Sequence, residues 1–96
     1  MKVTNIDPLT KATGSQKLSW DRIDNTHCLT TAYDHKKFII CKYTFKDTQT
    51  SVISFNYLDD DNSIIGDINE FAQGDNSFEE LNRLYEIANR PLLHFA

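Results

Sequence analysis

Apolar and polar residues alternate with a period of two from Thr26 to Phe71, and this pattern restricts the possible folds more than any other feature. Runs rich in Val, Ile, Thr, Tyr and Phe are separated by linkers that hold four polar residues each. The runs span 27–33, 38–45, 50–58 and 63–71. Linkers of this length are common hairpin loops, so 27–71 is predicted to form an antiparallel β-meander.

Symmetric pairing about the linkers predicts which side chains share a face of this sheet. It places Tyr33 opposite Phe38, Phe38 opposite Tyr57, Ile40 opposite Phe55, and Tyr57 opposite Ile64. The large apolar residues then gather on one face, which is the predicted core face. Its members are Leu29, Tyr33, Phe38, Ile40, Ile53, Phe55, Tyr57, Ile64 and Ile68. The outer face carries Cys28, Thr30, Cys41, Ser54, Asn56, Asp67 and Asn69.

A helix is predicted over 77–89, with apolar residues at helical spacing that cover the core face of the sheet. Ser77 and Glu80 fit a capping box at its start, and Pro91 is expected to end it. The apolar stripe consists of Phe78, Leu81, Leu84, Tyr85 and Ala88. The expected fold is therefore α+β, a four- or five-stranded antiparallel meander with one C-terminal helix on one face, in a single domain 1–96.

The segments that flank this pattern are less regular. Residues 1–17 are predicted to be an irregular arm, because Pro8, Gly14 and scattered polar residues break any period. Alternation over 17–23 allows one more edge strand, and the tail 92–96 either adds a strand or seals the margin of the core. Whether 63–71 is a strand or a short helix stays open.

Cys28 and Cys41 are the only cysteines, too few for a disulfide scaffold, and no targeting or membrane-spanning segment is recognisable. A reduced, cytoplasmic setting is the expectation. The predicted register makes the two cysteines diagonal neighbours on the outer face, where we interpret them as small, semi-buried apolar groups. A crosslink between them requires a tighter register.

Charge is divided unevenly along the chain. The first 46 residues hold eight Lys and Arg against four acids, and the last 50 hold two Arg against ten acids. The two parts therefore carry net charges of +4 and −8. We expect an acidic surface that binds a basic protein. The predicted partner-binding residues are Asp59, Asp60, Asp61, Asp67, Glu70, Asp75, Glu79 and Glu80.

The stretch 59–70 resembles a degenerate EF-hand loop, which gives a calcium-binding alternative. Its spacing offers oxygen ligands from Asp59, Asp61, Ser63, Asp67 and Glu70. However, Ile64 occupies the position where the EF-hand turn requires glycine, and no amphipathic helix precedes the loop. We therefore interpret 59–62 as a solvated hairpin turn and predict no metal.

Phosphate-binding, hydrolase and zinc motifs are missing from the sequence, so we expect a protein that is not an enzyme and needs no cofactor. The prediction is a small acidic protein that inhibits or masks a basic, nucleic-acid-handling protein. Phage- or plasmid-encoded anti-defence inhibitors and immunity proteins against nuclease toxins are analogous in type. We expect a monomer or homodimer that contacts neither nucleic acid nor membrane.

Two further alternatives remain. A basic hairpin formed by Lys36, Lys37, Lys42 and Lys46, together with Arg22, is the candidate surface for direct nucleic-acid binding. A structural subunit would instead associate with itself through the outer sheet face or through the tail that follows Pro91.

Overall fold

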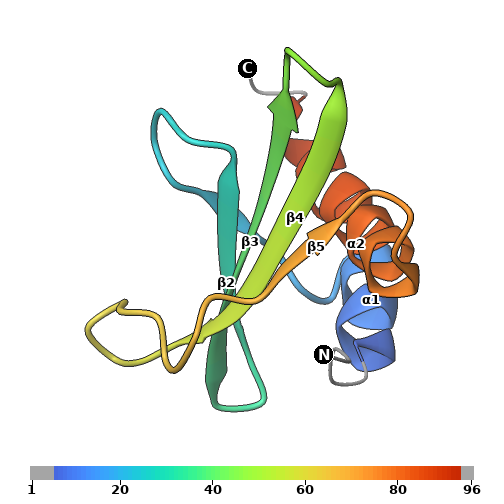
Figure 1. Ribbon diagram of the computed structural model, residues 1–96. Helices are drawn as coiled ribbons and strands as arrows, with labels where there is room; N and C mark the ends of the chain where they lie inside the picture. Colours follow the sequence, from blue (N-terminus) through green and yellow to red (C-terminus); the bar gives the residue numbers. More distant parts are fainter. Residues whose placement is uncertain (1–5, 94–96) are drawn as a thin grey trace.

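The computed structural model describes residues 6–93 as an α+β fold in which one antiparallel sheet supports two helices. The strands follow one another across the sheet in sequence order, β1 (Asp21–Arg22), β2 (Cys28–Tyr33), β3 (Lys36–Phe45), β4 (Thr50–Leu58) and β5 (Glu70–Ala72). The helices α1 (Asp7–Gly14) and α2 (Asn76–Leu93) lie on the same side of this sheet (Figure 1). The α+β meander and its C-terminal helix are thus confirmed, and β1 is the additional edge strand.

The turn between β2 and β3 is shorter than predicted, and it changes the register of this hairpin. Only Asp34 and His35 form the turn, with φ angles of 53° and 63°. Two central residues with positive φ make the tight turn whose twist matches that of antiparallel strands. Tyr33 therefore pairs with Lys36, and the predicted pairing of Tyr33 with Phe38 is wrong. The shift is an even number of residues, so every side chain keeps its predicted face.

The pairing of β3 with β4 is confirmed, because Phe38 lies opposite Tyr57 and Ile40 opposite Phe55. The pairing of Tyr57 with Ile64 is wrong, since Ile64 forms an isolated bridge with Leu58 instead. An offset of one residue moves a side chain to the other face. Ile64 accordingly leaves the core.

Most of the predicted strand 63–71 is irregular, and only its end belongs to β5. Gly66 has a φ angle of 77°, a left-handed conformation that interrupts an extended strand. Ile68, predicted to lie in the core, is 62% exposed. The chain between β4 and β5 is therefore a long loop and not a fourth hairpin.

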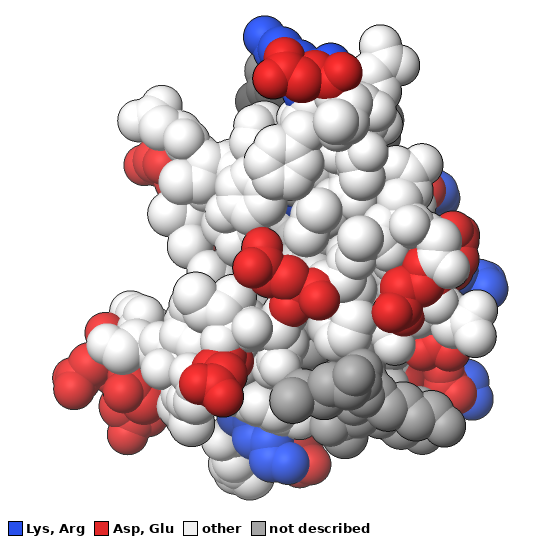
Figure 2. Space-filling view, in the orientation of Figure 1, with Lys and Arg blue, Asp and Glu red and all other residues white. Residues whose placement is uncertain are grey.

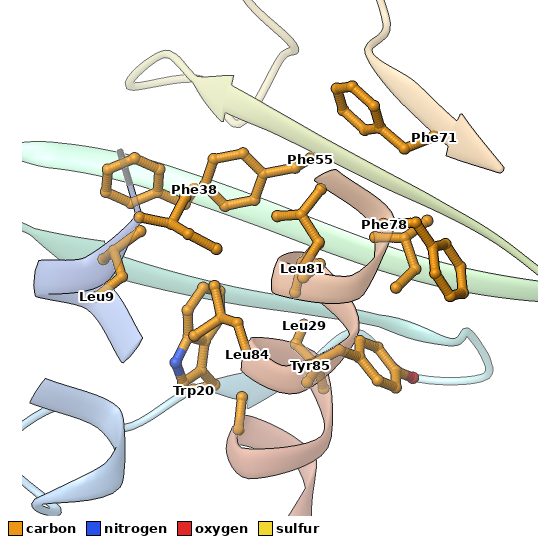
Figure 3. Packing of buried hydrophobic residues seen from close by; sticks show 14 residues of the cluster. Leu9, Trp20, Leu29, Phe38, Phe55, Phe71, Phe78, Leu81, Leu84 and Tyr85 are labelled. Atoms are coloured by element: carbon orange, nitrogen blue, oxygen red, sulfur yellow. The ribbon is translucent and has the colours of Figure 1, made fainter. Parts of the chain in front are cut away.

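The core lies between the sheet and the helices (Figure 3). All members of the predicted α2 stripe are buried, which confirms the helical spacing as the signal for this layer. They pack with apolar side chains of the sheet, among them Leu29, Phe38, Ile40, Ile53, Phe55 and Phe71. Tyr33 is not part of this cluster, because it lies near the end of the hairpin and is 36% exposed.

The predicted irregular arm 1–17 is wrong for 7–14, which form α1. Pro8 lies in the first turn of α1, where its missing N–H costs no helical hydrogen bond. Leu9 and Thr13 are buried, and Trp20 Nε1 donates a hydrogen bond of 3.0 Å to Thr13 Oγ1. Tertiary burial of this short helix outweighs the weak periodicity of its sequence.

Both ends of α2 differ from the prediction. Asp75, and not Ser77, caps the helix, since Ser77 N donates to Asp75 Oδ1 at 2.7 Å. The helix continues through Pro91 to Leu93, so the predicted stop at Pro91 is wrong. Proline removes one backbone hydrogen bond, and here that loss falls in the last turn. The tail predicted over 92–96 begins inside the helix, and 94–96 lie outside the described residues.

The contrast between two isoleucines tests this arrangement. Ile53 is fully buried in β4, whereas Ile68 is 62% exposed in the loop that follows. We expect Ile53→Ala to lower the free energy of unfolding by about 2–5 kcal/mol. The matched change Ile68→Ala should alter it by less than about 0.5 kcal/mol. Urea denaturation of both variants checks this, and similar losses at the two sites would contradict the assigned faces.

Candidate functional site

The candidate site is centred on the chain between β4 and β5, residues 59–69, which we call the acidic loop. Its first turn is organised by Asp59, whose Oδ1 accepts hydrogen bonds from the backbone N–H groups of Asp61 (2.8 Å) and Ser63 (2.9 Å). Asn62 takes a positive φ of 65°, which this residue type tolerates. Asp59 therefore supports the turn, while the neighbouring carboxylates of Asp60 and Asp61 face solvent.

The rest of the acidic loop is attached to β4. Ile65 N donates to the Tyr57 carbonyl at 2.9 Å. Asn56 is 1% exposed, and its Nδ2 donates to the Asp67 carbonyl at 2.9 Å. A buried amide that holds a loop carbonyl fixes the path of the chain, because leaving either group unpaired costs free energy.

Three isoleucines of the acidic loop are nevertheless exposed. Ile64, Ile65 and Ile68 have exposed fractions of 41%, 55% and 62%. A fixed loop that presents apolar side chains among carboxylates has the composition of an interaction surface. The period-two pattern predicts Ile64 and Ile68 in the core, and this prediction is wrong. In the sequence, only Gly66 indicates that the strand pattern is interrupted before Ile68.

The predicted acidic residues do not form one continuous patch. Asp59, Asp60, Asp61 and Asp67 lie in the acidic loop, and Glu70 follows it in β5. Asp75, Glu79 and Glu80 lie at the start of α2, which Figure 1 places across β5 from the tip of the acidic loop. In the space-filling view, acidic side chains form separate groups around a largely uncharged surface, and basic ones are fewer (Figure 2). The structure thus brings together the loop residues and leaves those of α2 apart.

The lysines of the predicted basic hairpin are also separated. Lys37 Nζ lies 3.4 Å from the Asp60 carbonyl and 3.3 Å from Asn62 Oδ1, so it joins the start of β3 to the acidic loop. Lys46 lies at the other end of β3, and Arg22 hydrogen-bonds Asn89 of α2. A surface that tracks a nucleic-acid backbone needs contiguous cations. The arrangement gives that alternative little support.

The calcium alternative meets a similar difficulty. Within residues 6–93, no group of three or more His, Cys, Asp or Glu side chains is placed to hold a metal ion. Asp59, the first residue of the proposed EF-hand spacing, directs its oxygen at backbone N–H groups of the loop itself.

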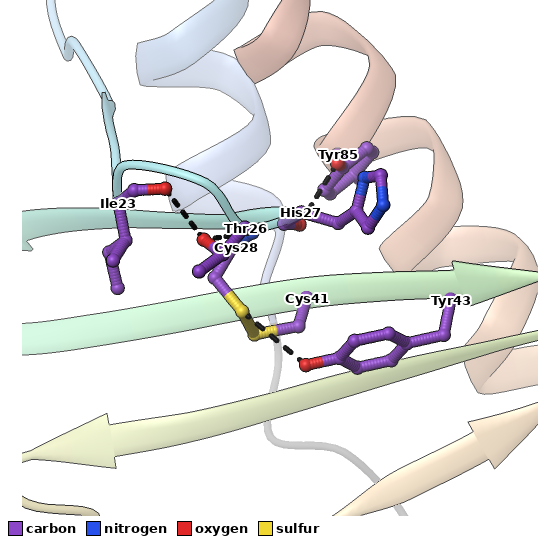
Figure 4. Close-up of a disulfide and its surroundings, with 7 residues drawn as sticks. All are labelled: Ile23, Thr26, His27, Cys28, Cys41, Tyr43 and Tyr85. Carbon is purple, nitrogen blue, oxygen red and sulfur yellow. Dashed lines mark hydrogen bonds between the residues drawn. A yellow bond between two sulfur atoms is a disulfide. The ribbon is translucent and has the colours of Figure 1, made fainter.

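Cys28 and Cys41 face each other directly on β2 and β3 and form a disulfide, with their Cα atoms 4.1 Å apart (Figure 4). The two-residue turn produces the tighter register that a crosslink requires. Their burial is confirmed, at 7% and 5% exposed, and of the two alternatives it is the crosslink, and not a reduced pair, that the structure contains. Disulfides are typical of oxidising compartments, so a cytoplasmic location stays a prediction.

The disulfide belongs to the outer face of the sheet, as predicted for both cysteines. The Tyr43 hydroxyl lies 3.6 Å from Cys28 Sγ. Figure 4 shows Ile23, the disulfide and Tyr43 on the side of the sheet away from Tyr85. Ser54 and Glu70 continue the row of cross-strand partners that begins with the cysteines. The outer face therefore joins the disulfide to the C-terminal end of the acidic loop.

Tyr85 of α2 lies on the core side of the sheet, next to the residue that precedes Cys28. Its hydroxyl donates a hydrogen bond of 3.0 Å to the His27 carbonyl. The pKa of Tyr85 is raised above its ordinary value, chiefly because the hydroxyl is buried. The positive charge of Arg22 opposes this shift, and Tyr43 adds a smaller increase. Helical spacing predicts only that Tyr85 belongs to the apolar stripe, because nothing in the sequence marks a backbone carbonyl as its partner.

No protein-family model matches the chain, and neither the curated proteins nor the solved structures contain a significant match. Neither of the two helices in the described part of the chain is long and apolar enough to cross a membrane.

Reduction tests the structural role of the disulfide. The crosslink closes a sequence separation of 13 residues, which corresponds to about 3 kcal/mol of unfolded-state entropy. We expect a dithiol reductant, or Cys28→Ser with Cys41→Ser, to lower the free energy of unfolding by up to about that amount. Chemical denaturation measures it. Thiol labelling that finds two free cysteines in the air-oxidised protein would contradict the pairing.

The ionisation of Tyr85 makes a second prediction. A pKa raised on folding means that the folded protein holds the phenol proton more tightly than the unfolded chain. This contribution to stability is complete below the unfolded value near 10 and is lost as the pH rises through the folded value. Ultraviolet titration should therefore show a late-ionising tyrosine that Tyr85→Phe removes. A late phase that persists in this variant would assign the shift to another residue.

Proposed function

We propose that the protein is a small non-enzymatic binding protein whose acidic loop docks onto a basic surface of another protein. The observation that carries the proposal is the exposure of Ile64, Ile65 and Ile68 within a loop rich in carboxylates. Protein interfaces combine an apolar centre with a polar rim. Here the isoleucines supply the apolar centre, while Asp60 and Asp61 supply acidic rim groups.

The order of the acidic loop supports the same proposal. Asp59 orders the first turn of the loop, and the hydrogen bonds of Asn56 and of the Ile65 N–H attach the loop to β4. A loop that is already fixed loses less conformational entropy on binding than a mobile one. The exposed isoleucines are thus presented in a defined arrangement.

Electrostatics select the class of partner. The last 50 residues carry a net charge of −8, and the acidic loop lies in this part of the chain. A surface potential of one sign accelerates encounter with the opposite sign and rejects like charge. The second acidic group, at the start of α2, adds to this field from the other side of β5. A basic partner is therefore favoured over a nucleic acid.

Basic surfaces of proteins commonly bind the phosphate backbones of nucleic acids. We propose that the partner is a nucleic-acid-handling protein, which the acidic loop inhibits or masks by occupying its basic site. This type of action is analogous to that of phage or plasmid anti-defence inhibitors and of immunity proteins. The proposed setting is cytoplasmic because the proposed partner handles nucleic acid, although the Cys28–Cys41 disulfide alone favours an oxidising compartment. No cofactor enters this mechanism.

A pair of charge-matched variants tests the proposal. Asp60→Lys with Asp61→Lys reverses the exposed rim of the acidic loop and leaves the Asp59 turn intact. Asp24→Lys with Asp47→Lys makes the same change in net charge at exposed positions elsewhere. We expect affinity capture from extracts of the source cells to recover a basic partner with the wild type and the control. The loop variant should recover at least about tenfold less.

Capture should be quantified by mass spectrometry and repeated at higher salt, which screens exposed charges. A partner that both variants retain equally would remove the acidic loop as the docking site. Equal loss from both variants would show dependence on net charge alone, which also contradicts the proposal.

A further inference from the structure

We infer that the cavity between α1 and the sheet receives one uncharged aromatic or aliphatic side chain of the basic partner, as the anchor of the complex. This inference rests on the proposed function and names what the partner inserts beside the acidic loop. The cavity has a volume of about 150 Å³. Figure 3 shows Leu9 of α1 facing Phe38 and Phe55 of the sheet, which both line it.

The interior of the cavity is apolar and already assembled. Phe38 and Phe55 stack with ring centroids 5.6 Å apart, and Tyr57 lies 5.1 Å from Phe38 and 6.4 Å from Phe55. Ile6 and Leu9, 4% and 5% exposed, close the opposite wall. Aromatic pairs at these separations are favourable in themselves, and a further ring can join them by edge or offset contacts.

The size of the cavity selects a side chain over a free ligand. A volume near 150 Å³ accepts a group about as large as benzene. Sites for free small molecules usually measure about 300–1,000 Å³. One protruding side chain such as that of phenylalanine or leucine fills a space of this size.

The apolar inner walls of the cavity select an uncharged occupant. Lys36 Nζ lies 6.0 Å from the centroid of the Tyr57 ring, and Asp34 lines the same mouth, so one charge of each sign stands at the entrance. A charged side chain that passed this mouth would lose its hydration among apolar walls that offer it no opposite charge. The basic residues of the partner are therefore expected outside the cavity, beside its mouth.

The acidic loop provides the surface on which those basic residues can lie. Lys36 and Tyr57 line the cavity and also an adjoining groove, whose other walls are formed by His35, Lys37, Leu58, Asp59, Asp60 and Ile65. A partner whose apolar side chain fills the cavity would therefore also contact the carboxylates and the exposed Ile65 in the groove beside it. A buried anchor with charged neighbours is the usual arrangement of an interface hot spot.

Short fluorescent peptides test the anchor without knowledge of the natural partner. The probes are Lys-Arg-Phe-Arg-Lys and Lys-Arg-Ala-Arg-Lys, which differ only in the central side chain. Fluorescence polarisation at low salt should show the phenylalanine peptide binding about tenfold or more tightly, as expected for burial of one such ring. Tyr57→Ala, which removes a cavity wall, should abolish this preference. The control Tyr43→Ala changes an exposed tyrosine that does not line the cavity, and this variant should keep the preference.

Methyl NMR of the wild-type protein provides a measurement that does not depend on a folded variant. The Leu9 methyl signals should shift with the phenylalanine peptide and stay in place with the alanine peptide. Equal affinity of the two peptides, or unchanged Leu9 signals on binding, would overturn the anchor.

The charge-reversed loop variant separates this inference from the proposed function. If Asp60→Lys with Asp61→Lys weakens both peptides but the phenylalanine preference is missing, the anchor is wrong and the acidic loop still stands. If the variant binds both peptides as the wild type does, the acidic loop itself is contradicted. Both proposals are supported only if the wild type prefers the phenylalanine peptide and the loop variant binds both peptides more weakly.

Discussion

The two-residue turn at Asp34 and His35 is the constraint on which the arrangement of the sheet depends. With both residues at positive φ, β3 returns along β2 in a register that places Cys28 directly opposite Cys41. The same register brings Tyr33 and Lys36 together at the mouth of the cavity and points Lys37 toward the acidic loop. A longer turn would separate the cysteines and move these groups relative to one another. A local backbone conformation therefore determines the crosslink, the cavity mouth and one attachment of the loop.

The covered part of the core face and its partly covered margin serve different purposes. The core face is covered by α1 and α2, and its packing of apolar side chains stabilises the fold. The margin where β2, β3 and the acidic loop meet is only partly covered, and there the cavity adjoins a groove with carboxylates. Hydrogen bonds of Asn56 and Asp59 hold the loop, so the exposed isoleucines are a fixed part of the surface. The proposed binding function depends on this combination of a rigid loop, exposed apolar groups and negative charge.

Sequence reasoning predicted the elements whose signal is periodic. The α2 stripe and the pairing of β3 with β4 follow from regular spacing, which burial on one face imposes. It failed for α1, where two buried residues and tertiary packing stabilise a helix of weak periodicity. It also failed at Ile64 and Ile68, because alternation cannot reveal the one-residue offset at the Leu58 bridge or the bend at Gly66. The exposed isoleucines of the candidate site depend on the offset at the Leu58 bridge and on the bend at Gly66, so only the carboxylates of the site could be predicted.

Hydrogen–deuterium exchange of the protein alone and in complex with its captured partner tests the docking surface most directly. The acidic loop as the docking site requires slower exchange over 59–69 in the complex, together with protection around Leu9 if the cavity is filled. The exposed side of α2 should exchange at the same rate in both states. Protection confined to α2, with unchanged exchange throughout 59–69, would contradict the binding role of the acidic loop.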